Sequence, residues 1–252
     1  MIIDMHGHIF YSNLDKDKRE VLKTIERYGV ERAYISAIEL SNHSPNEAEI
    51  DLYNNAAYQF ERENPKQLRS YCRVNVRNRN AVEVARRGIE EHNAIGLKLL
   101  AEVYMDDPMV FPVIEEAIRH NVPVLIHASH KASGSPMYTL ESHSGHIRRL
   151  ARRYPEARIV MAHTGGNAYL AVKDIIDVPN VCIDISGSLM RAGTLEYCVA
   201  HLRPDRILFG SDFPYVPHAI CAGKVQEAKL PQDVKEKIWF KNSLAVFEGG
   251  GV

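Results

Sequence analysis

The sequence lacks several features that would point to particular classes of protein. Its four cysteines are scattered over 252 residues without a C-x-x-C pair, which argues against structural disulfides and favours a reducing, cytosolic setting. Lys and Arg total 31 against 32 Asp and Glu, so the excess of positive charge that binds nucleic-acid phosphates is missing. No run of about 18 apolar residues occurs, and the N-terminus shows no signal-peptide pattern. We therefore expect a cytoplasmic chain that spans no membrane and binds no nucleic acid.

What the sequence does contain is a repeated alternation of short apolar runs with longer amphipathic stretches. Candidate strands are Met1–Met5, Arg32–Ile38, Leu68–Val74, Ile95–Leu99, Val122–His127, Arg158–His163, Val181–Ile185 and Arg206–Gly210. Helical spacing of apolar residues covers Asp15–Tyr28, Asn46–Asn64, Ala81–Asn93, Pro108–Asn121, Thr139–Tyr154, Asn167–Ile176 and Arg191–His201. Strands that alternate with helices in this way indicate parallel βαβ units.

Eight such strands in a chain of this length predict an α/β fold, a single (β/α)₈ TIM barrel over residues 1–252. The tail from Pro231 to Phe247 predicts a C-terminal closing helix. A doubly wound open sheet is the alternative fold, because hydrophobic periodicity alone does not show that the sheet closes.

Titratable side chains stand at the ends of several predicted strands. His6 and His8 end the first strand, His127 ends the fifth, His163 ends the sixth, and Asp212 follows the eighth. In a parallel barrel all carboxyl ends of the strands meet at one rim, where active sites of this architecture are built. We therefore expect these four histidines and one carboxylate to converge. Imidazole and carboxylate groups together indicate a site for zinc or a similar first-row divalent ion.

The spacing His6-Gly7-His8 has a geometric reason. Residues two apart on a strand point to the same face, so both imidazoles can share one ion. Asp4 has the same parity one step lower and is expected to orient a ligand through a hydrogen bond. Asp184, near the end of the seventh strand, supports the site or caps a loop.

At this point the chain resembles a known family. It is similar to the amidohydrolase superfamily, and within it to the amidohydrolase-related branch, which also contains decarboxylases of aromatic and related carboxylic acids. The motifs that carry the resemblance, in the family's order, are Asp4–His8 (DMHGH), Gly96–Leu99 (GLKL), Val124–His127 (VLIH), Ala162–Gly166 (AHTGG), Leu208–Pro214 (LFGSDFP) and the tail Ile238–Phe247. The resemblance implies His6, His8, His127 and Asp212 as metal ligands, and a catalytic or second-metal role for His163.

Lys98 ends the fourth predicted strand, and whether its side chain is carboxylated or cationic decides the number of ions. In two-metal members of the superfamily a lysine at this place is carboxylated and bridges both ions, and His127 and His163 would then hold the second ion. A cationic Lys98 would instead face the substrate, leaving one ion, expected to be zinc, and a free His163. Arg73 and Tyr104 follow nearby strands and are weaker candidates for substrate contact.

The preferred function is a metal-dependent hydrolase that cleaves a small amide, cyclic amide or lactone. The ion lowers the pKa of bound water toward about 7, Asp212 accepts the water proton, and His163 stabilises the oxyanion. The alternative is a non-hydrolytic decarboxylase of a small or aromatic carboxylic acid, in which Asp212 or His163 protonates the substrate carbon. A non-catalytic protein is the third reading, and it predicts the loss of ligand residues, none of which is missing. Homo-oligomerisation is expected only because symmetric oligomers are common.

Overall fold

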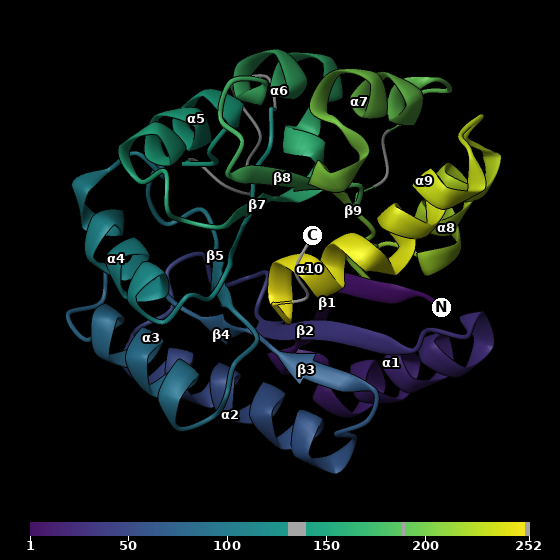
Figure 1. Ribbon diagram of the computed structural model, residues 1–252. Coiled ribbons are helices and arrows are strands. Elements are labelled where there is room, and N and C mark those ends of the chain that lie inside the picture. The colour runs from purple at the N-terminus through teal and green to yellow at the C-terminus, as the bar shows by residue number, and fades with distance from the viewer. Residues whose placement is uncertain (131–139, 188–189, 250–252) are drawn as a thin grey trace.

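The strands of the computed structural model form a ring that helices surround (Figure 1). The structure describes residues 1–130, 140–187 and 190–249. Its strands are β1 (Ile3–Phe10), β2 (Arg32–Ile38), β3 (Leu68–Ser70), β4 (Cys72–Arg73), β5 (Leu97–Leu99), β6 (Val124–Ile126), β7 (Ile159–Met161), β8 (Val181–Asp184) and β9 (Ile207–Leu208). Each is parallel to its neighbours, in the orders β1-β2-β3 and β4-β5-β6-β7-β8-β9.

Backbone hydrogen bonds join these two sheets into one closed barrel. Only Tyr71 separates β3 from β4, and its N–H donates to the Ile35 carbonyl at 2.8 Å, so the two segments form one strand position. At the other junction the Met5 N–H donates to the Phe209 carbonyl at 3.1 Å and the His8 N–H to the Phe213 carbonyl at 2.8 Å. The predicted (β/α)₈ barrel is therefore confirmed, and the open-sheet alternative is wrong.

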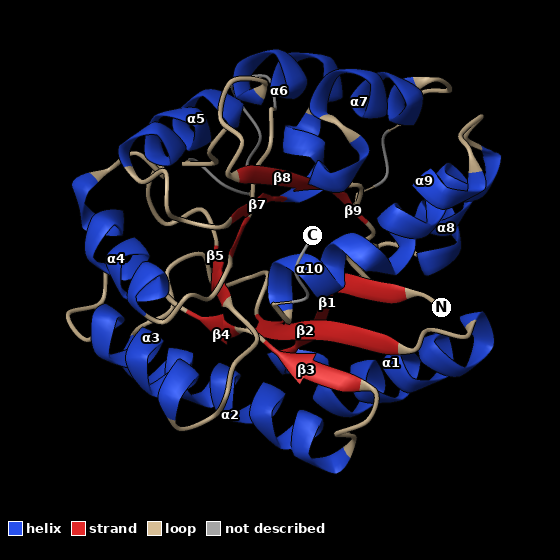
Figure 2. Cartoon of the chain, viewed as in Figure 1, coloured by secondary structure: helices blue, strands red, loops and turns tan. Residues whose placement is uncertain are grey.

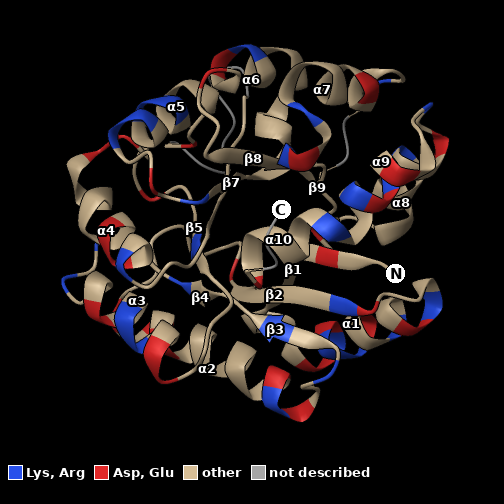
Figure 3. Cartoon of the chain, viewed as in Figure 1, with Lys and Arg blue, Asp and Glu red and all other residues tan. Residues whose placement is uncertain are grey.

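The helices pack outside the ring and cover its apolar outer face (Figure 2). They are α1 (Leu14–Tyr28), α2 (Glu47–Glu63), α3 (Ala81–Glu90), α4 (Phe111–Arg119), α5 (Ser144–Arg153), α6 (Ala168–Ile175), α7 (Thr194–Leu202), α8 (His218–Glu227), α9 (Gln232–Glu236) and α10 (Asn242–Phe247). Charged side chains lie mainly on these helices, whereas the strands are mostly uncharged (Figure 3). No helix in the described ranges is long and apolar enough to cross a membrane.

The C-terminal segment closes one end of the barrel, as the sequence predicts. It is broken into α9, a π-helical turn at Lys237–Lys241 and α10 rather than one continuous helix. The Phe247 ring packs edge-on against Tyr34 and Tyr71, with ring centroids 5.2 and 5.8 Å apart. Because Arg158, directly before β7, donates to the Val246 carbonyl, α10 covers the end of the ring where the strands begin. The opposite end, where the strands finish, remains for the polar side chains.

Two predicted elements have different bounds in the structure, and one helix was not predicted. β1 runs to Phe10 rather than ending at Met5, so the two histidines lie inside the strand; the apolar pattern stops early because this half of the strand carries polar side chains. α8 was not predicted, because its apolar residues lack clear helical spacing. The helix predicted from Thr139 begins at Ser144, and Thr139 itself lies outside the described residues.

A bulge in β1 changes which side chains face the barrel interior. The register between β1 and β2 shifts between Asp4 and Gly7, and such a bulge redirects the side chains on either side of it. Ile3 and Met5 pack inside the ring, and His6 and His8 also point inward above them. Asp4 instead points toward α8. The prediction that Asp4 shares the face of the histidines is therefore wrong, because the bulge breaks the alternation on which it rested.

The seam is the junction at which β1 meets the segment after β9, and Gly7 lies in it. A Cβ atom at this position would overlap the Phe213 ring, so a substitution of Gly7 tests how closely the seam is packed. Gly7→Ala is expected to lower the free energy of unfolding by about 1–3 kcal/mol through overpacking. Gly223→Ala is the matched control: it lies within α8, nothing lies within 4 Å of its added Cβ, and it should be neutral or stabilise by up to ~1 kcal/mol. Urea unfolding of both metal-free variants measures the difference, and equal stability would contradict the close packing of the seam.

Candidate metal centre

Three buried donor atoms meet where β1 and the segment after β9 come together. The Nε2 atoms of His6 and His8 lie 3.1 Å apart. Asp212 Oδ1 lies 3.1 Å from His8 Nε2 and 3.5 Å from His6 Nε2. These are the kinds of donor that bind first-row divalent metal ions. The structure therefore brings three of the four expected ligands together.

Hydrogen bonds to the other ring nitrogens determine which atoms of the two histidines are free to bind. His6 Nδ1 lies 2.7 Å from Asp184 Oδ2, so it carries the proton and donates it to the carboxylate. His8 Nδ1 lies 3.4 Å from the Ser36 carbonyl and 2.9 Å from the Ser36 hydroxyl, and only a protonated Nδ1 can donate to a carbonyl. Both neutral rings then direct Nε2 lone pairs at each other, an unfavourable contact that a shared cation relieves. The residues present fit a divalent metal ion.

Asp184 and Ser186 extend from β8 beneath these ligands. Ser186 Oγ donates to Asp184 Oδ1 and also lies 3.1 Å from His6 Nδ1 and 2.8 Å from His163 Nδ1. Of the two roles left open for Asp184, the structure supports orientation of His6. The sequence reasoning missed Ser186, although its position two residues after Asp184 places it where same-face spacing could have found it.

His163 reaches the site through an unusual turn after β7. His163 and Thr164 have φ angles of 58° and 50°, in the left-handed region that costs a non-glycine residue of order 1–3 kcal/mol. The turn brings His163 Nε2 to 3.2 Å from Nδ1 of His127. Asp212 is left-handed as well, with a φ of 68°. Strained backbone at two site residues is the pattern expected where geometry serves function.

His127 lies next to His163 rather than within the three-donor group. Its Nε2 is 3.0 Å from Glu141 Oε1, a contact that the sequence reasoning missed because Glu141 follows no strand. Because a carboxylate accepts, Nε2 carries the proton and the lone pair of Nδ1 faces His163. The assignment of His127 as a ligand of the first ion stays a prediction.

Lys98 is fully buried at the carboxyl end of β5, with its Nζ 2.9 Å from His6 Nε2. Burial lowers the pKa of Lys98 to about 8, although the negative charges of Asp212 and Asp184 oppose the shift. The side chain is therefore mainly an ammonium ion at neutral pH, with an accessible neutral form. An ammonium ion can occupy the position beside the histidine nitrogens when no metal is bound.

Burial favours the neutral form of three imidazoles near the site. It lowers the pKa of His8 to about 4, and it also lowers the pKa values of His127 and His163. Burial acts to raise the pKa of Asp212, but its contact with the His8 ring and the other nearby histidines outweigh burial and hold this pKa below its usual value. Neutral imidazoles and an ionised carboxylate are the protonation states that metal binding requires.

The two weaker substrate candidates lie in different surroundings. Arg73 is buried and forms an ion pair with Glu102, a partner that the sequence reasoning missed. Tyr104 is 39% exposed, and its ring stacks on His146 with centroids 4.4 Å apart. A substrate contact by either residue stays a prediction.

Comparisons with known proteins agree with this architecture. The family model described as amidohydrolase matches residues 3–249, and no curated protein sequence matches the chain. Solved structures that resemble it include 5-carboxyvanillate decarboxylase from Sphingomonas paucimobilis, with a TM-score of 0.79 and 17% identity over 98% of each chain.

Dihydroxybenzoic acid decarboxylase from Polaromonas sp. JS666, solved with bound manganese and the inhibitor 2-nitroresorcinol, has a TM-score of 0.77 and 17% identity, over 100% of this chain and 98% of that one. 4-Oxalomesaconate hydratase from Rhodopseudomonas palustris has a TM-score of 0.72 and 14% identity, over 98% and 96%. At these identities the likeness to solved structures concerns the fold alone. The match of the family model over nearly the whole chain shows that the protein belongs to the amidohydrolase family.

Proposed function

We propose that the protein is a metal-dependent decarboxylase of a small carboxylic acid that carries a hydroxyl group beside the carboxylate. The observation that carries this proposal is the buried Lys98 ammonium, whose Nζ lies 2.9 Å from a metal-donor nitrogen of His6. Similarity to decarboxylases of hydroxylated aromatic acids supports it. Decarboxylation therefore replaces hydrolysis, which the sequence favoured, as the preferred function.

The charges of the site favour an anionic substrate. The three grouped donors contribute one negative charge, that of Asp212, because an imidazole that binds a metal ion does so in its neutral form. A bound divalent ion therefore keeps a net positive charge. When the ion takes the His6 nitrogen, the Lys98 ammonium is released from it and adds a second positive charge nearby. In a buried site this positive charge attracts a carboxylate more strongly than a neutral amide.

When bound, the ion supplies the positive charge that holds the substrate carboxylate and the neighbouring oxygen. Asp212 is ionised and accepts the proton of the substrate hydroxyl as the substrate binds. The bond between the substrate carbon and its carboxylate then breaks, carbon dioxide leaves, and the electron pair stays on the carbon. Asp212 returns the proton to that carbon, so atoms and charge balance. Lys98 holds the departing carboxylate, and Asp184 keeps the His6 imidazole in position.

A two-ion hydrolase of a small amide, cyclic amide or lactone is the second candidate. The lowered pKa of Lys98 favours it, because the neutral amine can add to carbon dioxide, forming a nitrogen–carbon bond and releasing a proton. The facing nitrogens of His127 and His163, 3.2 Å apart, would then help to hold a second ion. The two candidates differ in the number of ions and in the charge of Lys98.

Metal content distinguishes them first. Protein purified without chelator is expected to contain about one equivalent of zinc or manganese by elemental analysis, lost in His6→Ala because that change removes one ligand. His201→Ala, an exposed histidine on α7, is the control and should keep the metal. Two equivalents would favour the hydrolase, and no metal after resupply of zinc and manganese would contradict the metal centre.

Carbon dioxide release tests the reaction itself. The metal-loaded protein is expected to release carbon dioxide from at least one member of a panel of hydroxylated benzoic and aliphatic acids. Asp212→Asn should lower kcat by about 10²–10⁴-fold, because it removes the group that moves the proton. Asp205→Asn, which alters a surface pair with Arg203, should leave kcat unchanged. Hydrolysis of a lactone or amide without carbon dioxide release would overturn the proposal in favour of the second candidate.

Lys98→Met removes the charge while keeping the length of the side chain. A cationic Lys98 predicts that kcat/KM for the acid falls by about 10–100-fold, the cost of losing a hydrogen bond to a charged group, while one equivalent of metal remains bound. A carboxylated Lys98 predicts instead that the second metal equivalent disappears. Measurement of metal content and steady-state kinetics on the same preparation separates these outcomes.

A further inference from the structure

We infer that His218 is a positioning residue: through Asp4 it fixes the orientation of Asp212 and so sets the affinity of the protein for its metal ion. His218 is the first residue of α8 and lies outside the barrel. Among the described residues, its ring nitrogens contact Asp4 but none of the metal-ligand side chains. The inference rests on the metal centre of the proposed function but not on the reaction that the centre catalyses.

The Asp4 carboxylate is the link between α8 and the ligands. It is fully buried on the outer side of β1 and accepts hydrogen bonds from three other residues. The Ser211 hydroxyl and N–H donate to it at 2.6 and 3.0 Å, and the His6 N–H at 3.3 Å. His218 Nδ1 lies 2.9 Å from Oδ2 and donates the fourth hydrogen bond. One carboxylate thus joins the backbones that carry two metal ligands, from segments 207 residues apart.

Ser211 transmits this restraint to Asp212. Its N–H and hydroxyl are both held by Asp4, and its carbonyl faces the Cys221 thiol of α8 at 3.5 Å. The next residue, Asp212, has the left-handed φ of 68° and donates its N–H to the His6 carbonyl at 2.7 Å. A left-handed aspartate needs its neighbours to hold it in place, and Asp4 supplies that restraint from one side.

The surroundings of His218 indicate that its Nδ1–H is what the protein retains. Its ring stacks on Tyr28 at 4.8 Å and meets the edges of Phe209 and Phe213 at 5.2 and 6.4 Å. The Nε2 atom is buried, and no described residue hydrogen-bonds to it. An apolar ring would fill this aromatic enclosure without leaving a nitrogen unpaired. A histidine here therefore serves the one bond that an apolar ring cannot make, the bond to Asp4.

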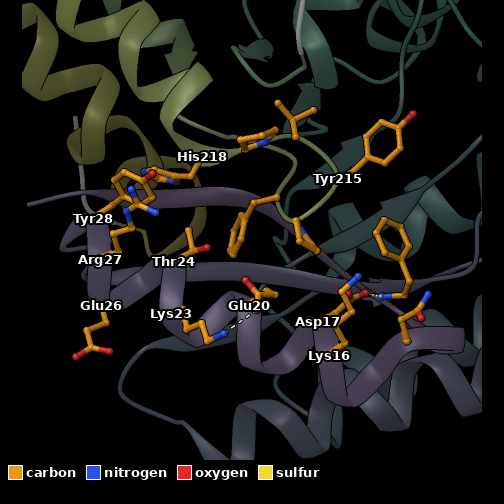
Figure 4. Close-up of a pocket in the computed structure, with 16 residues that line it drawn as sticks. Lys16, Asp17, Glu20, Lys23, Thr24, Glu26, Arg27, Tyr28, Tyr215 and His218 are labelled. Carbon is orange, nitrogen blue, oxygen red and sulfur yellow. Dashed lines mark hydrogen bonds and ion pairs between the residues drawn. The ribbon is translucent and has the colours of Figure 1, made fainter.

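His218 lines one end of a groove between α1 and the segment after β9, where Tyr28 and Arg27 lie next to it (Figure 4). The groove has a volume of 960 Å³. Because His218 itself is 3% exposed, substitutions there change neither the protein surface nor the metal donors directly. An effect on metal binding must therefore pass through Asp4 or through the packing of Phe209 and Phe213, and the substitutions below distinguish these two routes.

Two substitutions of His218 separate positioning from packing. His218→Phe keeps an aromatic ring and removes the donor, so the Kd for Zn²⁺ or Mn²⁺ is expected to rise about 10–100-fold, the usual effect of losing an outer hydrogen-bond partner. His218→Asn places an amide N–H near the position of Nδ1 and is expected to restore the Kd to within about threefold of wild type. Ser211→Ala, which removes the hydroxyl donor without adding volume, should weaken binding as His218→Phe does.

The metal alone is the probe, titrated into the apo full-length chain against a chromophoric chelator. The visible absorption of bound Co²⁺ reports ligand geometry, and it should change in His218→Phe and return in His218→Asn. Wild-type affinity and a wild-type spectrum in both His218→Phe and Ser211→Ala would overturn the inference. Equal losses of metal affinity in His218→Phe and His218→Asn would also overturn it, because they would indicate a packing role. If His218→Phe does not fold, Ser211→Ala and His218→Asn still test the inference, which requires weaker metal binding in the first and near wild-type binding in the second. A wild-type protein that binds no ion would overturn the metal centre itself, whereas absence of decarboxylation would leave this inference intact.

Discussion

Strands β1 and β9 meet at the seam that closes the barrel, and the backbone hydrogen bond from Asp212 to His6 lies in that seam. The bond joins two metal ligands directly, so the step that completes the ring also assembles the donor group. Gly7 lets the Phe213 ring pack against the strand, and the buried Asp4 carboxylate ties Ser211 to the same strand. Because the seam sets the positions of His6, His8 and Asp212 together, the metal centre depends on closure of the barrel.

A second constraint is the gathering of positive charge and neutral imidazole in one buried space. Lys98 stays mainly protonated despite burial because Asp212 and Asp184 lie near it, and its charge adds to the lowering of the His8 pKa that burial causes. Neutral imidazoles are ready to bind a cation, whereas protonated ones would repel it. The same arrangement would leave a loaded centre positive, which is the physical basis for proposing a carboxylate as the substrate.

Much of this architecture could be predicted from the sequence because it follows local rules. Apolar runs separated by amphipathic helices predicted the strand positions, and the ends of those strands predicted where His6, His8, His163 and Asp212 lie. Predictions that relied on ideal geometry were less successful. The bulge in β1 turned Asp4 to the opposite face, and α8 was missed because its apolar residues do not recur at helical spacing.

The sequence by itself determined the alternation of strands and helices and the residue types at the strand ends, because periodicity and side-chain chemistry are properties of short segments. Only the tertiary structure decided which groups touch: that Asp184 and Ser36 orient the two histidines, that Lys98 lies against His6, and that His218 bonds to Asp4. These contacts join segments far apart in the chain. Their geometry depends on a bulge, on left-handed turns and on closure of the ring, and none of these is written in the local pattern of residues.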